Sequence, residues 1–336
     1  MKRREFIGLV GGAAAWPFAV RAQQVAPRPR IGWVHPSAHL SDMRVDGTDP
    51  VYRAFPDELR RLGYVEDANL TIERYSGEGR RDHYAELAHI AVQSQPAVIF
   101  SSGTDMTRLV AAETRTIPII AVLTDPVSTG LLTNLAHPSG NITGASVDAG
   151  IEIWSKRIAL LKEVLPSASR VGFLCSRSFW QSTGQSAQVS RVVAAKLGLT
   201  LVGCLLQEDL QEAEYRRVFA AMPHDGLDAL MVSEQAEHRV NRALIVQLTS
   251  EARLPTIFCY RDFVDLGGLM AYAVDLGDAF RQAARQVDQI LKGAHPSDIP
   301  FYQQTRFELV INLKTANSFG IVMPPALLGS ADEVIE

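Results

Sequence analysis

One local pattern recurs along the chain and constrains its fold: a short apolar run ends in a small polar turn, and helical spacing follows. The run at 97–100 (AVIF) leads into the turn 101–104 (SSGT) and into a helical pattern that begins at Met106. A continuous apolar run of this length is typical of a strand buried on both faces of a parallel sheet. Strands that alternate with helices in this way predict an α/β fold with helices on both faces of the sheet.

The pattern occurs twice, which predicts two similar α/β units in series. In the first unit we expect strands at 30–34, 69–75, 97–100 and 117–122. We expect the chain to pass out of this unit at residues 141–144. In the second unit we expect strands at 170–175, 199–206, 227–232 and 255–260. A further strand at 269–272, a long amphipathic helix at 276–291 and a last strand at 307–312 must pack onto both units. The chain therefore crosses between two lobes more than once, which makes a hinge.

The first 22 residues have the features of an export signal. A basic start (Lys2, Arg3, Arg4) precedes the apolar stretch 6–20, and small residues stand at Val20 and Ala22 before the expected cleavage point. The stretch is too short for a membrane-spanning helix. The arginine pair also fits a twin-arginine signal, so both that route and the general secretory route remain open. Export places the mature chain in the periplasm.

Composition excludes several classes of protein. With 336 residues, 47% of them hydrophobic, the chain has enough apolar surface for two domains. Removing the signal takes away four basic residues and one acidic residue, which changes the net charge from −4 to −7. An acidic chain without a Lys/Arg-rich block is not expected to bind nucleic acid. Three cysteines, Cys175, Cys204 and Cys259, lie in apolar runs, and we expect them to be buried free thiols. One disulfide between two of them remains an open alternative in an oxidising compartment.

Polar and aromatic residues gather just after the expected strands. The carboxyl ends of the strands in an open α/β sheet are where ligands bind. Hydroxyls and helix N-termini suit a carboxylate, and Asp125 or Glu234 suits an ammonium group. Ordinary helix capping explains each of these residues equally well when it is taken alone. The candidate ligand-binding residues are Ser37, Ser102, Gly103, Thr104, Thr124, Asp125, Ser176, Ser178, Glu234, Tyr260 and Tyr272.

No motif for enzyme chemistry stands in the sequence. We find no nucleophile elbow, phosphate-binding loop, zinc-protease motif or dinucleotide fingerprint. The eight His and three Cys show no metal-ligand spacing, so we expect no catalytic residue, metal or cofactor.

The chain resembles the periplasmic substrate-binding component of ABC transporters, in the family that includes tryptophan- and phenylalanine-binding proteins. The matching stretches keep their order over about 280 residues, and they are 55–65, 102–104, 117–119, 125–127, 141–144, 260–264, 267–270, 290–293 and 307–316. The resemblance implies a type I periplasmic-binding-protein fold, with two Rossmann-like lobes, parallel sheets and a three-segment hinge. We expect lobe 1 to comprise 30–145 plus 268–296, and lobe 2 to comprise 146–267 plus 297–329.

The resemblance also implies a function. Such a receptor captures a small polar or amino-acid-like ligand between its lobes and, as a monomer, delivers it to an ABC permease in the inner membrane. Two alternatives remain open at this point. One is an exported α/β enzyme, and the other is a sensory module that presents its ligand to a membrane receptor.

Overall fold

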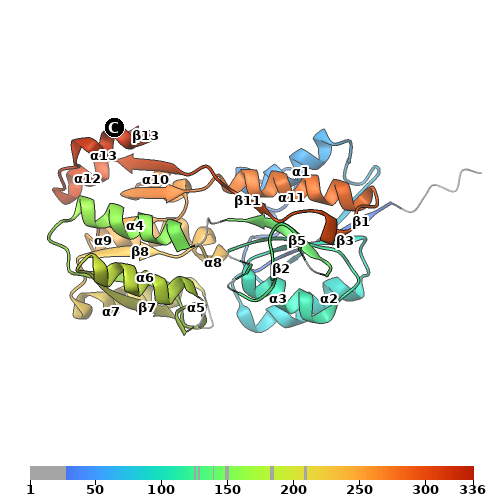
Figure 1. Ribbon diagram of the computed structural model, residues 1–336, viewed down its shortest axis with the longest axis horizontal. Coiled ribbons are helices and arrows are strands. Elements are labelled where there is room, and N and C mark those ends of the chain that lie inside the picture. The colour runs from blue at the N-terminus through green and yellow to red at the C-terminus, as the bar shows by residue number, and fades with distance from the viewer. Residues whose placement is uncertain are drawn as a thin grey trace, which may run out of the picture.

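The computed structural model describes residues 28–124, 126–127, 129–138, 140–147, 151–181, 185–207 and 210–336, except the side chains of 151–152 and 185–187. The expected export signal and the candidate residue Asp125 lie outside these residues. Among the described residues the strands form two sheets, one of six strands and one of seven. Each sheet is the centre of one lobe, and the two lobes lie end to end along the long axis of the molecule (Figure 1).

The first lobe contains a parallel sheet between two pairs of helices. Its strands run in the order β2 (Thr71–Ser76), β1 (Arg30–His35), β3 (Val98–Ser102), β4 (Ile119–Leu123), β5 (Ile142–Ser146) and β11 (Tyr302–Gln303). One face is covered by α1 (Pro50–Arg61) and α11 (Leu276–Leu291), and the other by α2 (Tyr84–Gln93) and α3 (Thr104–Glu113) (Figure 1). The short helices η1 (Arg81–His83) and η3 (Pro296–Asp298) complete this lobe.

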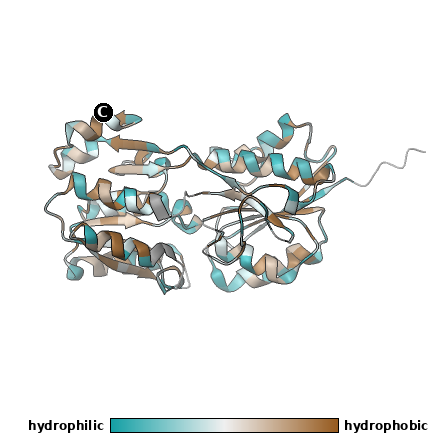
Figure 2. Cartoon of the chain, viewed as in Figure 1, coloured by the Kyte–Doolittle hydropathy of each residue, from teal (hydrophilic) through white to brown (hydrophobic). Residues whose placement is uncertain are grey.

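The alternation of side chains along β3 explains why residues 98–100 of this strand are all apolar. Phe100 faces α1 and α11, where its ring stacks on Phe55 at 4.3 Å and meets Phe280 edge-on at 5.4 Å between centroids. Its neighbour Ile99 faces α2 and α3 and belongs to a separate apolar cluster. Both faces of the strand are therefore buried, and the strands in the interior of each lobe are correspondingly hydrophobic (Figure 2).

The second lobe repeats this arrangement with one antiparallel pair. Its strands run in the order β7 (Thr200–Leu206), β6 (Arg170–Ser176), β8 (Ala229–Val232), β9 (Thr256–Phe258), β10 (Met270–Ala273), β12 (Glu308–Asn312) and β13 (Glu333–Ile335). Only β10 and β12 pair antiparallel among the described strands. Its helices are α4 (Ile151–Val164), α5 (Arg177–Gln181), α6 (Gln185–Lys196), α7 (Glu212–Ala221), η2 (Met222–Asp225), α8 (Ala236–Val240), α9 (Arg242–Glu251), α10 (Arg261–Asp265), α12 (Leu313–Phe319) and α13 (Pro325–Ser330).

Sheet membership shows where the chain crosses between the lobes. In the described part of the chain three connections join them: from β5 to α4, from β10 to α11, and from β11 to β12. This arrangement agrees with the expected three-segment hinge and with the α/β fold of two lobes. In open α/β sheets ligands bind at the carboxyl ends of the strands.

Three sequence expectations differ from the structure. Residues 141–144 do not leave the first unit, because 142–146 form β5 and pair with β4. The expected lobe 1 segment 268–296 divides, because β10 finds its partners in the second sheet whereas the apolar face of α11 is buried on the first. The expected lobe 2 segment 297–329 contributes β11 to the first sheet, where it pairs with β5.

The three cysteines are free and buried in the structure. Burial raises the pKa of all three thiols, that of Cys204 to about 12, so little reactive thiolate forms near neutral pH. We therefore expect a thiol reagent such as Ellman's to find no reactive thiol in the native mature chain and three after denaturation. A disulfide in the purified protein would lower the count after denaturation to one and would contradict this description.

Candidate functional site

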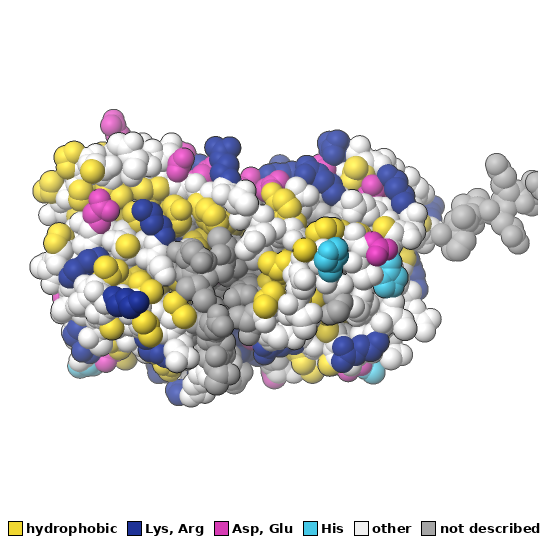
Figure 3. All heavy atoms as spheres, viewed as in Figure 1, with side chains coloured by type: hydrophobic (Ala, Val, Ile, Leu, Met, Phe, Trp, Pro, Cys, Tyr) yellow, Lys and Arg dark blue, Asp and Glu magenta, His cyan; other side chains and the backbone are white. Residues whose placement is uncertain are grey.

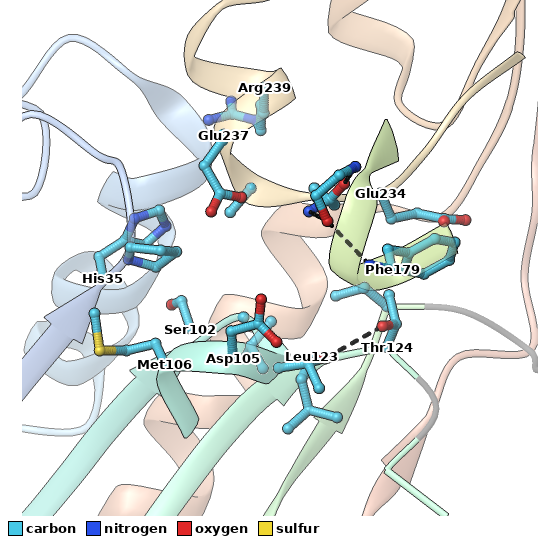
Figure 4. Close-up of a pocket in the computed structure, with 18 of the residues that line it drawn as sticks. His35, Ser102, Asp105, Met106, Leu123, Thr124, Phe179, Glu234, Glu237 and Arg239 are labelled. Atoms are coloured by element: carbon cyan, nitrogen blue, oxygen red, sulfur yellow. Dashed lines mark hydrogen bonds between the residues drawn. The ribbon is translucent and has the colours of Figure 1, made fainter. Parts of the chain in front are cut away.

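A cavity of about 460 Å³ lies between the lobes and receives residues from both. Eight of the eleven residues that the sequence analysis selects line it, and they are Ser102, Gly103, Thr104, Thr124, Ser176, Ser178, Glu234 and Tyr260. Figure 4 shows Ser102, Leu123 and Thr124 on one side of this cavity and Phe179 and Glu234 on the other. Loops at the carboxyl ends of strands in two separate sheets thus meet at this cavity, as expected for ligand sites in open α/β sheets.

The turn from β3 into α3 builds the first-lobe wall of the cavity. Gly103 has a φ of +79°, which L-residues with a side chain rarely adopt, and a Cβ here would lie 3.3 Å from Pro36. The turn places Thr104 at the first position of α3, with its hydroxyl 3.3 Å from that of Thr124. Within the described residues, the backbone N–H groups of residues 104–106 make no hydrogen bond, as expected for the first turn of a helix. These donors and the positive end of the helix favour an anionic group.

Two adjacent serines of β3 differ in what they contact. The Ser101 hydroxyl lies 2.9 Å from that of Thr107 on α3 and is fully buried. The Ser102 hydroxyl is also buried, lines the cavity, and has no hydrogen-bond partner among the described residues. A buried hydroxyl without a partner is costly. Ser102 is therefore suited to donate a hydrogen bond to a ligand.

The second-lobe wall is a hydrogen-bonded polar loop. The Ser176 backbone N–H donates to Gln235 Oε1 at 2.6 Å, and the Gln235 amide donates to Ser176 Oγ at 3.0 Å. Ser178 Oγ lies 3.0 Å from Ser176 Oγ. Residues 177–181 form the short helix α5, which also places Phe179 on the cavity.

Glu234 has a buried guanidinium partner. Its Oε1 is bonded to Arg157 of α4, and both side chains are at most 1% exposed. Arg157 also donates to the backbone carbonyl of Tyr272 at 2.9 Å. The carboxylate that the sequence offers for an ammonium group is therefore already neutralised from within the lobe.

Tyr260 lies beside Glu234 and is almost fully buried. Its hydroxyl donates to the Glu234 backbone carbonyl at 3.3 Å, and burial holds its pKa well above the usual value. The hydroxyl therefore stays protonated and is a neutral part of the cavity wall.

Of the other three selected residues, two do not line the cavity and one lies outside the described residues. Ser37 is buried behind it, where its backbone N–H donates to His35 Nδ1 at 3.1 Å. Tyr272 lies on the opposite face of β10 from Ala271 and Ala273, where its ring stacks on Phe307 at 5.6 Å between centroids. Asp125 lies outside the described residues.

Sequence reasoning missed a charged group that comes from α8 and its neighbours. Glu237 and Arg239 of this five-residue helix line the cavity, as do Arg81 and Asp105 of the first lobe. Burial and, to a lesser extent, the nearby Arg239 charge lower the pKa of His35, another lining residue, to about 3, so the imidazole is neutral. A helix this short gives no periodic signal, and the partners of its charges are far away in the sequence.

Polar contacts from this group join the lobes beside the cavity. The Tyr84 hydroxyl donates to Glu237 Oε1 at 2.8 Å, and Arg81 donates to Ser178 Oγ at 2.7 Å. Arg239 donates to both carboxylate oxygens of Asp49 at 2.9 and 2.8 Å. The lobes are therefore in contact around the cavity.

Elsewhere the described residues show no metal cluster and no membrane-spanning helix. No group of three or more His, Cys, Asp or Glu is placed there to hold a metal ion. No helix in the same part of the chain has both the length and the apolar character needed to cross a membrane. On the face shown in Figure 3, Lys and Arg side chains are interspersed with Asp and Glu and form no single basic patch.

Known proteins resemble this chain over most of its length. A tyrosine-binding protein of Clostridioides difficile is 24% identical over 272 residues, which cover 80% of this chain and 75% of that protein. The crystal structure of an ABC domain from Streptococcus pneumonia in complex with L-Trp has a TM-score of 0.78 at 26% identity, covering 92% of this chain and all of that one. A conserved domain protein from Vibrio cholerae has the same TM-score at 23% identity, covering 91% of this chain and 99% of that one.

A family model describes proteins of this kind. The model of the ABC transporter substrate binding protein family matches residues 42–335. The match confirms the resemblance found in the sequence, and the family is one of binding proteins rather than enzymes. Because the match spans most of the chain, this protein belongs to the ABC transporter substrate binding protein family.

Proposed function

We propose that this receptor captures an amino-acid-like ligand in the cavity between its lobes and delivers it to an ABC permease. The observation that carries the proposal is the Ser102 hydroxyl, buried and without a partner in the described chain, beside the unbonded N–H groups that begin α3. Together they form a site for a carboxylate. The expected export signal supports action in the periplasm, and we propose that the receptor acts there as a monomer.

The apolar part of the cavity supports a ligand with a hydrophobic or aromatic side chain. Met106, Leu123, Phe179 and Phe280 line it from four different elements. Cavities of several hundred Å³ with apolar walls and a few placed polar groups are typical of small-molecule sites. The relatives that bind tyrosine and L-Trp make these two amino acids the first probes.

The proposal is tested by thermal melting of the mature chain after it has been unfolded, freed of ligand and refolded. The panel contains the L-amino acids, with sugars and nucleosides as matched controls. A ligand at 100 times its Kd stabilises the native state by about 2.7 kcal/mol, so the amino acid that fits will raise the melting temperature clearly. If a sugar or a nucleoside raises it and no amino acid does, the proposed ligand class is wrong.

Replacing Ser102 by alanine is expected to weaken binding of that amino acid by about 10- to 150-fold. Hydrogen bonds to charged groups contribute about 1.5–3 kcal/mol, which corresponds to this range of Kd. Ser101→Ala is the matched control, because the Ser101 hydroxyl contacts Thr107 and does not line the cavity. Isothermal titration calorimetry gives both values. Equal affinities of the Ser102→Ala variant and the wild type would remove Ser102 from the site.

A further inference from the structure

We propose that Glu237 binds the cationic group of the ligand, and that the ligand displaces a proton from this carboxyl group to the solvent as it binds. The inference rests on the proposed function, because it requires a ligand with both a carboxylate and an ammonium group. It assigns the two charges of the ligand to opposite lobes, with the carboxylate on α3 and the ammonium group on α8.

The position of Glu237 supports this assignment. The residue is 4% exposed and lines the cavity from α8. In Figure 4 its carboxyl group points into the cavity toward the side on which Ser102 lies. One oxygen, Oε1, accepts from the Tyr84 hydroxyl at 2.8 Å. No other side chain of the described residues donates to this carboxyl group, so its second oxygen is open to a ligand that donates.

A comparison with Glu234 shows why Glu237 is the better cation site. Both carboxyl groups lie on the cavity, but Glu234 is bonded to Arg157. No Arg, Lys or His of the described chain lies within ion-pair distance of Glu237. The cation whose charge acts on Glu237, Arg81, donates to Asp105 at 2.6 Å and to Ser178 at 2.7 Å. An ammonium group would give Glu237 the charged partner that the protein does not provide.

Four titratable groups surround Glu237, and burial among them keeps its carboxyl group protonated to a higher pH than an exposed one. They are Arg81 of η1, Tyr84 of α2, Asp105 of α3 and Tyr215 of α7. Burial raises the pKa of Glu237 above its usual value, and the opposing effects of Arg81 and Tyr84 do not cancel this. Burial also raises the pKa values of Tyr84 and Tyr215, so both hydroxyls stay neutral.

The sign of the pH dependence follows from this arrangement. A cation beside Glu237 favours the ionised carboxylate, so its pKa is lower in the complex than in the free protein. Between these two pKa values, binding releases a proton. Affinity is therefore constant above the raised pKa of the free protein and falls as the pH drops through it.

The experiment uses calorimetry of the refolded mature chain between pH 5 and 8 in two buffers with different protonation enthalpies. The probes are L-tryptophan and L-tyrosine, followed by the amino acid that gives the largest thermal shift, each beside its deaminated analogue. We expect wild type to bind the amino acid about tenfold or more tightly than the analogue, as for hydrogen bonds to charged groups, and its binding heat to depend on the buffer. Glu237→Gln should lose both the preference and the buffer dependence.

Two control variants separate Glu237 from its neighbours. Asp105→Asn tests the rival assignment of the cation site, because Asp105 also lines the cavity and its side chain is 46% exposed. Tyr84→Phe removes the hydroxyl that donates to Glu237 but keeps the carboxyl group, and should keep the preference. If Asp105→Asn rather than Glu237→Gln loses the preference, the cation site is assigned to the wrong residue.

The outcomes also distinguish this inference from the proposed function. If wild type binds the analogue as tightly as the amino acid, Glu237 does not bind the ammonium group, whereas amino-acid binding itself stands. If no amino acid binds, both proposals fail. Should Glu237→Gln not fold, the wild-type heats decide, because equal heats in the two buffers exclude proton release.

Discussion

Replacing Arg157 by methionine is expected to lower the free energy of unfolding by about 3–5 kcal/mol, because it leaves a buried charge without its partner. Arg157 is fully buried in α4, and its guanidinium group is bonded to Glu234. It also donates to the carbonyl of Tyr272, near the connection from β10 to α11. The substitution therefore removes a contact between the cavity wall and one of the crossings between the lobes. Urea denaturation of the mature chain measures the change.

A double variant tests this explanation. Arg157→Met combined with Glu234→Gln removes the buried charge as well as its partner, so it should recover part of the lost stability. A double variant that is less stable than Arg157→Met alone would contradict the explanation. A single variant within about 0.5 kcal/mol of wild type would contradict it too, since that is the size of an ordinary surface effect.

Replacing Arg239 by methionine is the second substitution with a large expected effect, again about 3–5 kcal/mol. Arg239 is 3% exposed and joins Asp49 of the first lobe to the second lobe through two hydrogen bonds. Its Nε also lies 2.9 Å from Asp262 Oδ2, in an ion pair without hydrogen-bond alignment. Burial raises the pKa of Asp49, but Arg239, with smaller contributions from Arg242 and the Val51 N–H, more than offsets it, so the pKa lies below its usual value and the carboxylate is charged.

Arg242→Met is the matched control for Arg239. Arg242 contacts the same two carboxylates, at 3.4 Å from Asp49 and 3.6 Å from Asp262, but it is 29% exposed. Partly exposed ion pairs typically contribute at most about 1 kcal/mol. Urea denaturation should therefore find Arg239→Met much less stable than Arg242→Met. Equal losses in the free energy of unfolding for the two variants would show that the buried contact between the lobes has no special role.

The fold was largely predictable because its signals are local. The run before Ser102 and the apolar stripe of α11 are each visible within a few residues, and both elements occur where the sequence places them. The membership of β10 was not predictable, because it depends on pairing with β12, almost forty residues later. The strand β5 was missed for a related reason, since the polar and glycine residues at 141–144 resemble a loop until β4 is beside them.

The site was predictable where a strand end alone decides the position. Ser102 and Thr104 follow a clear strand, and both line the cavity. Tyr272 was selected by the same rule, but the alternation of side chains along β10 turns it toward Phe307. Glu237 was not predictable, because its partner Tyr84 is 153 positions away and α8 is only five residues long. Such a contact exists only after both lobes have folded and met.

The central claim is that an amino-acid-like ligand binds between the lobes with its carboxylate at the start of α3. The most direct measurement is a crystal structure of the mature chain with the amino acid that raises its melting temperature most. We predict electron density for that ligand in the cavity, with its carboxylate within hydrogen-bond distance of Ser102 Oγ and of the N–H groups of Thr104 or Asp105. Density for the ligand at any other place, or with its carboxylate turned toward Glu237, would contradict the account.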